Sequence, residues 1–159
     1  MPSLYPNPSD DIVATLTDQA RSYIARATLG DMVFTVAGFG LGRGGFGPTD
    51  PTVVLPLNTL ATELDDKVYP TSTPYDLATF VSTESPTDTV RVYNCRVASA
   101  LVAGNADYAL GELALYGLVV NSISAPLEIG TYFLYALSHF PCLCKTRRDV
   151  LLRRVIVSY

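Results

Sequence analysis

The chain has 159 residues, a net charge of −4, and 16% charged against 48% hydrophobic residues. This length fits one domain, and the composition excludes a disordered chain, which needs low hydrophobicity and high charge. The shortage of charges favours a protein whose surface is partly covered by other subunits.

The charges are unevenly distributed. Residues 1–88 carry eleven acidic and four basic residues, whereas residues 89–159 carry four acidic and seven basic residues. The late bases alternate with aliphatic residues in VLLRRVIVSY, a strand pattern without the interleaved aromatic residues of nucleic-acid binding. The most apolar stretch, 108–120, contains Glu112 and is shorter than the ~20 residues of a membrane-spanning helix. We therefore expect neither nucleic acid nor a membrane as a partner.

An amphipathic helix is predicted over about residues 9–29. Ser9 is a favoured N-cap, Asp10 and Asp11 suit the positive end of the helix dipole, and Gly30 can end the helix. The apolar positions recur with a spacing near 3.6 residues and comprise Ile12, Leu16, Tyr23 and Ala27. We expect this face to be buried against a sheet or a sister subunit.

A strand is predicted at residues 32–36, followed by a glycine-rich loop over 38–47. Six glycines in ten residues disfavour both helix and strand, because each costs backbone entropy on ordering. The loop also carries Phe39, Leu41 and Phe46, which suit a contact better than a solvated turn, and Arg43, which could pair with an acid. We expect this loop to be a protein interface.

The remaining segments are mostly β. A short helical turn is predicted around residues 57–64, and surface loops are predicted over 71–88, where Thr, Ser, Pro and Asp are frequent. Residues 89–159 hold runs rich in β-branched and aromatic residues, which predict strands. The predicted fold class is α+β and strand-dominated: one N-terminal helix followed by a β-rich region, in a single domain over 1–159.

The segment 40–45 matches the dinucleotide-binding pattern G-x-G-x-x-G. A dinucleotide site needs a helix to start at the third glycine, and Pro48 and Pro51 exclude a helix there. No acidic residue ends a second strand about 20 residues later. We interpret the match as coincidental and expect no nucleotide cofactor.

His139, Cys142 and Cys144 raise the question of a zinc site, with Cys95 as a fourth ligand. Their H-x-x-C-x-C spacing differs from that of the paired ligand units of structural zinc sites. Buried, reduced cysteines are the better interpretation, since the N-terminus lacks the basic region and apolar core of a secretory signal. We expect no bound metal and a cytoplasmic setting.

No catalytic set is visible. His139 is the single histidine in the chain, and no serine lies in a G-x-S-x-G nucleophile elbow. We expect the protein not to be an enzyme. Ten tyrosines without a tryptophan leave open a host-surface or glycan-binding function, because tyrosine suits hydrated interfaces.

Several short segments resemble the phage tail-collar fibre family. Residues 16–20 (LTDQA) are similar to its opening "LTdaG", and residues 34–40 (FTVAGFG) to the apolar strand and glycine segment that follow. Residues 110–117 (LGELALYG) resemble its later "irEiGLy" strand, with Glu112 at the acidic position and Ala114 in place of the usual glycine.

The end of the sequence follows the same order. The family closes with a strand, a proline turn, a Lys-Thr pair and a final strand, which resemble residues 134–137, 140–141, 145–146 and 150–159. The resemblance implies a virion structural protein of the tail or baseplate, usually a homotrimer, that joins a fibre to the tail. Family members continue into a fibre shaft and a receptor-binding end, whereas this sequence stops where the collar-like part ends, so we expect an adaptor whose partners are other tail proteins.

Overall fold

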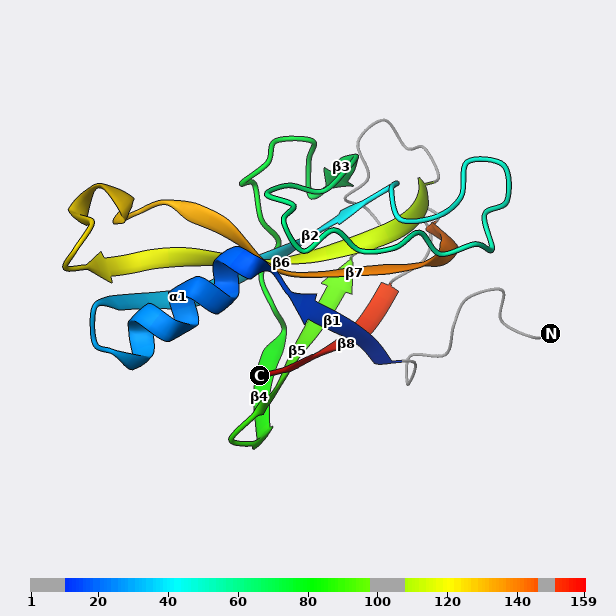
Figure 1. Cartoon of the computed structure of the whole chain (residues 1–159). Coiled ribbons are helices and arrows are strands. Elements are labelled where there is room, and N and C mark those ends of the chain that lie inside the picture. The colour runs from blue at the N-terminus through cyan, green and yellow to red at the C-terminus, as the bar shows by residue number, and fades with distance from the viewer. Residues whose placement is uncertain (1–10, 98–107, 146–150) are drawn as a thin grey trace.

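The computed structural model describes residues 11–97, 108–145 and 151–159. The described residues form one sheet of eight strands in the order β3-β2-β6-β7-β1-β8-β5-β4 (Figure 1). The elements in chain order are β1 (Asp11–Leu16), α1 (Asp18–Thr28), β2 (Met32–Gly42), β3 (Lys67–Tyr69), β4 (Ser82–Thr87), β5 (Val90–Val97), β6 (Tyr108–Ser122), the 3₁₀ helix η2 (Pro126–Glu128), β7 (Tyr132–Lys145) and β8 (Leu151–Ser158).

The α+β class predicted from the sequence is wrong. Strands take up 54% of the structure and helices 11%, and the sheet is curled into a half-barrel. The error comes from the N-terminus, where the part Asp11–Leu16 of the predicted helix is a strand in the middle of the sheet. β1 pairs with β7 on one side and with β8 on the other.

The helix begins at Asp18 and not near residue 9. The β-branched residues of the segment DIVATLT favour an extended backbone, and Ile12, Ala14 and Leu16 face one side of β1 with a period of two. Thr17 is the actual N-cap, and its side chain accepts a hydrogen bond from the Ala20 N–H at 3.1 Å. The predicted cap, Ser9, lies outside the described residues. The predicted end is confirmed, because Gly30 adopts a positive φ of 78° directly after the helix.

α1 packs on the strands β2 and β7. Its buried residues are Ala20 and Tyr23, and the Tyr23 ring meets the Phe133 ring edge-on with centroids 4.7 Å apart. Gly117 on β6 makes room for Phe133, since a Cβ there would lie 2.3 Å from the ring. The helix is therefore held by aromatic contacts within the chain.

The predicted glycine-rich loop is also wrong over its first half, because Gly38–Gly42 belong to β2 and pair with β6. The glycines alternate with large apolar residues along the strand, so one face is bare backbone and the other carries Phe39 and Leu41. The bare face is closely covered, because a Cβ at Gly38 would lie 2.5 Å from the carbonyl oxygen of Ala78. Phe39 and Leu41 are buried in the core of the chain.

The other predicted elements have mixed outcomes. No helix forms over residues 57–64, and β4 lies within the predicted loops of 71–88. The strands predicted after residue 89 are confirmed where the structure describes them, as β5, β6, β7 and β8.

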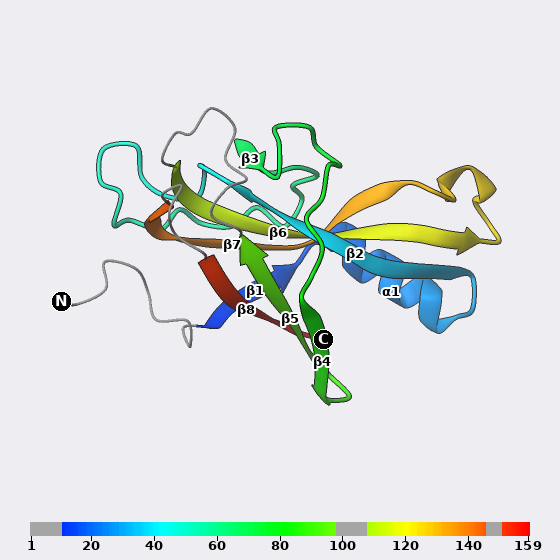
Figure 2. The ribbon, with the colours of Figure 1, turned by 180° about the vertical axis from the view of Figure 1, so that it is seen from behind.

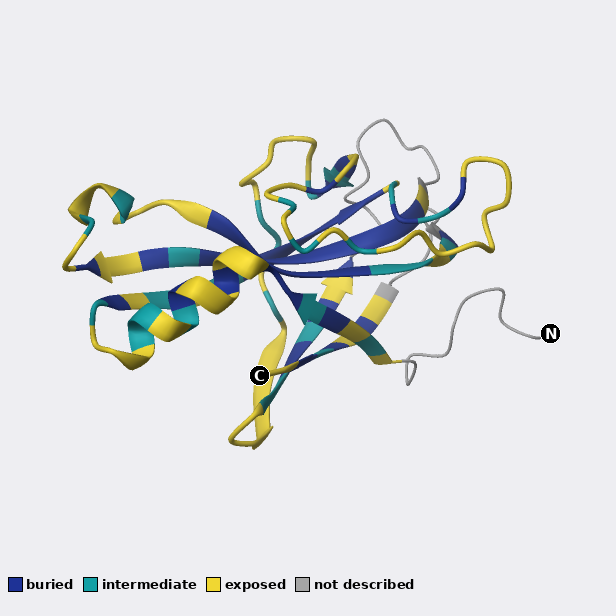
Figure 3. Cartoon of the chain, viewed as in Figure 1, coloured by how far each residue is buried: buried dark blue, intermediate teal, exposed yellow. Residues whose placement is uncertain are grey.

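Successive residues of β6 and β7 are buried, so the sheet is covered on both faces there (dark blue in Figure 3). The larger cluster includes Phe39, Leu113, Tyr93 and Val155. The smaller cluster, of Ala114, Tyr116, Leu134, Leu137 and Leu64, lies where the segment 57–77 crosses β6 and β7. The connections before and after β3 therefore act as a cover over part of the sheet.

Part of the molecule extends away from the curled sheet. The start of β2, the end of β6, η2 and the start of β7 run outward together with α1 along one side (Figures 1 and 2). We call this part the α1 lobe. In the portion of the chain that the structure describes, no helix is long and apolar enough to cross a bilayer.

Candidate functional site

The α1 lobe is tied together by one arginine. Arg26, near the end of α1, binds Asp31 through Nε at 2.9 Å and Glu128 through Nη1 at 2.8 Å. Its Nη2 donates to the hydroxyls of Ser122 at 2.9 Å and Ser124 at 3.1 Å. We call this network the Arg26 clamp. It joins the helix to the β6–β7 connection, which is about a hundred residues further along the chain.

Asp31 completes the Arg26 clamp. Its carboxylate accepts hydrogen bonds from the Ser124 hydroxyl at 2.6 Å and the Ser124 N–H at 2.9 Å. The Ser124 hydroxyl and then Arg26 lower the pKa of Asp31, and the hydrogen bonds to Asp31 and Glu128 raise the pKa of Arg26. These contacts tie the connection around η2 to the helix.

The same lobe exposes large apolar side chains. Leu127 is 97% exposed, Leu29 85% and Ile123 70%. They belong to a set at the outer end of the lobe, which we call the lobe patch: Leu29, Val33, Val120, Ile123, Leu127 and Ile129. Exposed apolar groups on a fixed scaffold are typical of a surface that binds another protein.

A buried carboxylate lies at the opposite end of the same strands. Glu112 on β6 is fully buried and accepts hydrogen bonds from three backbone N–H groups, those of Gly44 at 3.2 Å, Asp65 at 3.1 Å and Asp66 at 2.8 Å. We call this arrangement the Glu112 cradle. The carboxylate holds together β6, the turn after β2 and the segment before β3.

The glycines of the sequence motif surround this carboxylate. A Cβ at Gly42 would lie 2.2 Å from Oε1 of Glu112, and one at Gly44 would lie 2.8 Å from Oε2. Gly45 has a φ of 89°, and its Cβ would lie 2.1 Å from the carbonyl oxygen of Gly111. Gly42 and Gly44 thus let the backbone approach an internal anion, and Gly45 lets it approach the backbone of β6.

His139 lies beside Glu112. The two residues are direct partners across β6 and β7, so their side chains share one face. Nδ1 of His139 is 2.9 Å from the carbonyl oxygen of Leu55. A ring nitrogen of His139 and carboxylate oxygens of Glu112 and Asp65 all lie within 4.8 Å of one another. Within the described ranges, these three residues are the ones that could hold a metal ion.

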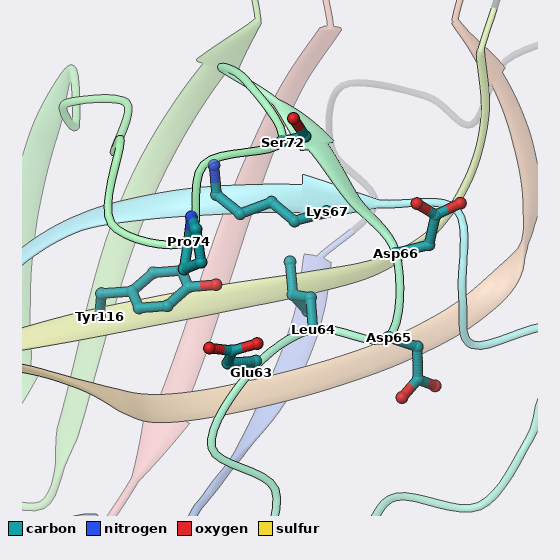
Figure 4. Close-up of a pocket in the computed structure, with 8 residues that line it drawn as sticks. All are labelled: Glu63, Leu64, Asp65, Asp66, Lys67, Ser72, Pro74 and Tyr116. Atoms are coloured by element: carbon teal, nitrogen blue, oxygen red, sulfur yellow. The ribbon is translucent and has the colours of Figure 1, made fainter.

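A polar hollow of about 240 Å³ adjoins the Glu112 cradle (Figure 4). The Tyr116 hydroxyl points into it, and burial, followed by the charge of Glu112, raises the pKa of that tyrosine. Lys67 forms one wall; its Nζ donates to the carbonyls of Thr71 at 2.5 Å and Thr73 at 2.8 Å, and burial lowers its pKa. The complete lining is Glu63, Leu64, Asp65, Asp66, Lys67, Ser72, Pro74 and Tyr116.

Two partly exposed tyrosines lie near this hollow. The rings of Tyr75 and Tyr132 stack with centroids 5.5 Å apart, and Tyr75 also meets Tyr116 edge-on at 6.2 Å. Tyr75 is 43% exposed and Tyr132 37%. A stacked aromatic pair beside carboxylates and hydroxyls can bind a polar molecule that has an apolar face.

The interface residues predicted from the sequence differ in how far the structure buries them. Leu16, Tyr23, Phe39 and Leu41 lie in the core of the chain, so their side chains are not available at its surface. Ile12 and Phe46 are half-buried, and Phe46 covers Gly111, whose Cβ would lie 2.1 Å from the ring. Among the predicted residues, Arg43 is exposed, at the turn after β2.

Of the cysteines whose side chains the structure describes, neither Cys95 nor Cys142 belongs to the group of ligand atoms around His139. Cys95 is buried on β5, where burial raises the pKa of its thiol to about 12, and Cys142 is half-buried on β7. The side chain of Cys144 lies outside the described residues. The residues that do meet His139 are carboxylates from the strand beside it and from the segment before β3.

Comparisons with family models, with curated proteins and with solved structures find no match to this chain. The resemblance to the tail-collar fibre family therefore rests on the sequence motifs alone.

The sequence interpretation missed both polar networks. The lone acid Glu112 within the apolar run 108–120 was a signal, because an isolated carboxylate in a buried strand requires hydrogen-bonding partners. Asp31 is only five residues from Arg26, but Ser122, Ser124 and Glu128 are about a hundred residues away, and no local pattern connects them to the helix.

Proposed function

We propose that the protein is a structural subunit of a bacteriophage tail, which joins a tail fibre to the baseplate or tail tip through protein contacts. The observation that carries the proposal is the lobe patch, a set of exposed apolar side chains on the lobe that the Arg26 clamp ties together. A fixed, exposed Leu127 suits a permanent contact, because little conformational entropy is lost when it is covered. The tail-collar resemblance and the low charge content support the same assignment.

The lobe patch gives the proposal a direct test. Leu127→Ser combined with Ile123→Ser should leave folding intact and prevent incorporation into tails, because the change removes apolar contact area without touching the Arg26 clamp. Val13→Ser is the matched control, since Val13 is also exposed, at 67%, but lies on β1. Tails of the virus that encodes the chain would be imaged and their protein content measured. Normal incorporation of the double variant, or absence of the protein from purified particles, would contradict the proposal.

The proposed assembly includes a homo-oligomer, most simply a trimer. Sedimentation equilibrium of the purified chain should give three times the monomer mass, or the trimer should form when the partner is added. A monomer that enters the particle in isolated single copies would contradict this part of the proposal.

A second candidate function is binding of a host-surface glycan. The stacked pair of Tyr75 and Tyr132 beside the polar hollow favours it, since sugars combine an apolar ring face with hydroxyl groups. A glycan array should then show binding that Tyr75→Ala removes and Tyr75→Phe retains, because phenylalanine keeps the stacked ring. No binding by the unmodified protein would exclude this candidate.

A further inference from the structure

We propose that Asp65, Glu112 and His139 form a site for a divalent transition-metal ion such as zinc. This goes beyond the proposed assembly function and revises the expectation that the chain holds no metal. The three residues come from different segments, and their ligand atoms already lie within 4.8 Å of one another.

The ligand types suit such an ion. One imidazole and two carboxylates form a mixed nitrogen and oxygen set, which zinc, manganese and iron accept and which magnesium and calcium use less often. Two carboxylates with a neutral imidazole carry a charge that a divalent cation neutralises. Zinc ligands at about 2.0 Å from the metal lie about 3.3 Å apart, whereas these ligand atoms lie up to 4.8 Å apart, so the widest separation must close by as much as about 1.5 Å. Asp65 is exposed and can supply that movement.

The surroundings orient two of the ligands. A carbonyl oxygen can only accept, so the contact with Leu55 places the proton on Nδ1 of His139 and leaves the Nε2 lone pair for a ligand. Such a bond from the second ring nitrogen to a carbonyl is the usual support of a metal-binding histidine. Glu112 is held by backbone N–H groups that use three of its roughly four acceptor positions. One position remains for a metal.

The test is zinc binding by the full-length chain without a histidine tag. The protein would be treated with a chelator, dialysed, and titrated with zinc chloride in a calorimeter, with a thermal melt before and after. We expect one zinc ion per chain and a higher melting temperature when zinc is present, because a ligand that binds only the folded state stabilises it. Absence of saturable binding would overturn the proposal.

Matched variants distinguish this site from others. Asp65→Asn and His139→Gln should each weaken zinc binding by about tenfold or more, whereas Asp66→Asn should not, since the carboxylates of Asp65 and Asp66 point in different directions (Figure 4). Cys142→Ser should also retain binding. The melting temperature without zinc shows whether each variant folds. Equal loss in Asp65→Asn and Asp66→Asn would indicate diffuse binding by acidic residues, and loss in Cys142→Ser alone would indicate a cysteine site; either result overturns the proposal.

Discussion

The Arg26 clamp and the Glu112 cradle both use one charged side chain to join segments that are far apart in sequence, but they do so in different surroundings. Arg26 and its acidic partners retain 23–30% of their side-chain exposure and bond mainly through side chains. Glu112 is fully buried, and it accepts hydrogen bonds from backbone N–H groups. Water and salt therefore weaken the clamp, whereas the cradle is shielded from both.

The fold should therefore depend more on one of these two networks than on the other. Loss of a partner from the clamp lets water take its place, because the other groups are already near solvent. Loss of the carboxylate from the cradle leaves buried N–H groups without an acceptor, which is the more costly outcome. The fold thus depends on the cradle, and the clamp mainly shapes the surface of the α1 lobe.

The largest effect should follow from Glu112→Ala. Removing the carboxylate should cost about 3–5 kcal/mol of unfolding free energy, the range for breaking a buried charged network. Chemical denaturation measures it, with Glu63→Ala as the control, since Glu63 is an exposed acid close by. A loss below about 1 kcal/mol would mean that water replaces the carboxylate.

The stability losses in Gly45→Ala and Gly30→Ala compare the two regions, because Gly45 lies beside the Glu112 cradle and Gly30 lies in the α1 lobe. Both glycines have a positive φ, 89° and 78°, but a Cβ at Gly45 meets the carbonyl oxygen of Gly111, while one at Gly30 meets nothing within 4 Å. Gly45→Ala should cost about 2–4 kcal/mol, from backbone strain and crowding together. Gly30→Ala should cost only about 1 kcal/mol from strain. Equal losses in urea denaturation would show that crowding at the cradle relaxes.

Arg26→Gln should lower the melting temperature by about 2–4 °C in dilute buffer, the shift expected when a partly exposed ionic network is lost. The loss should shrink in about 0.5 M salt, where the Debye length is only a few ångströms. The loss in Glu112→Ala should stay unchanged by salt. Arg21→Gln, an exposed position on the same helix, is the control. If salt leaves the effect of Arg26→Gln unchanged, the Arg26 clamp is shielded from solvent in the same way as the Glu112 cradle.

The smallest effect should be the pH dependence of Asp31→Asn. The lowered pKa of Asp31 means that its carboxylate stabilises the folded state above the ordinary value of 3.8, and that this stability is lost as the pH falls through the lowered pKa. The variant should therefore be less stable than the parent near neutral pH and equally stable in strong acid. Thermal melts across this range measure the difference, and a constant difference would contradict the assignment.

The sequence predicted the late strands better than the N-terminus. Runs such as TVRVYNCRV contain β-branched and aromatic residues that agree with a strand whichever element lies beside it. Ile12, Leu16 and Tyr23 fit a helical spacing by coincidence. Ile12 and Leu16 belong to the strand β1, whereas Tyr23 belongs to the helix α1. Thr17, as an N-cap directly before Asp18, was the local signal that separates them.

The site depends on contacts that no local pattern contains. The glycines at 42, 44 and 45 suggested an interface loop, because their role depends on Glu112, which lies 68 residues from Gly44. His139 was compared with the cysteines near it in sequence, whereas its neighbours in space come from β6 and from the segment before β3. Hydrophobic alternation reports which face of a strand is buried, but not which distant backbone covers it.

The position of β1 in the chain also determines how early it can pair with β8 during synthesis. It is the parallel partner of β8, and Asp11 lies 143 residues before Arg154, to which it is bonded. At a synthesis rate of about 5–20 residues per second, β1 waits roughly 7–30 s before β8 has been made. During that interval, its backbone N–H and C=O groups on that side have no sheet partner, and an apolar strand with an open edge pairs readily with other chains. Completion of the sheet is therefore a late event, and the nascent chain is most exposed to aggregation before β8 is added.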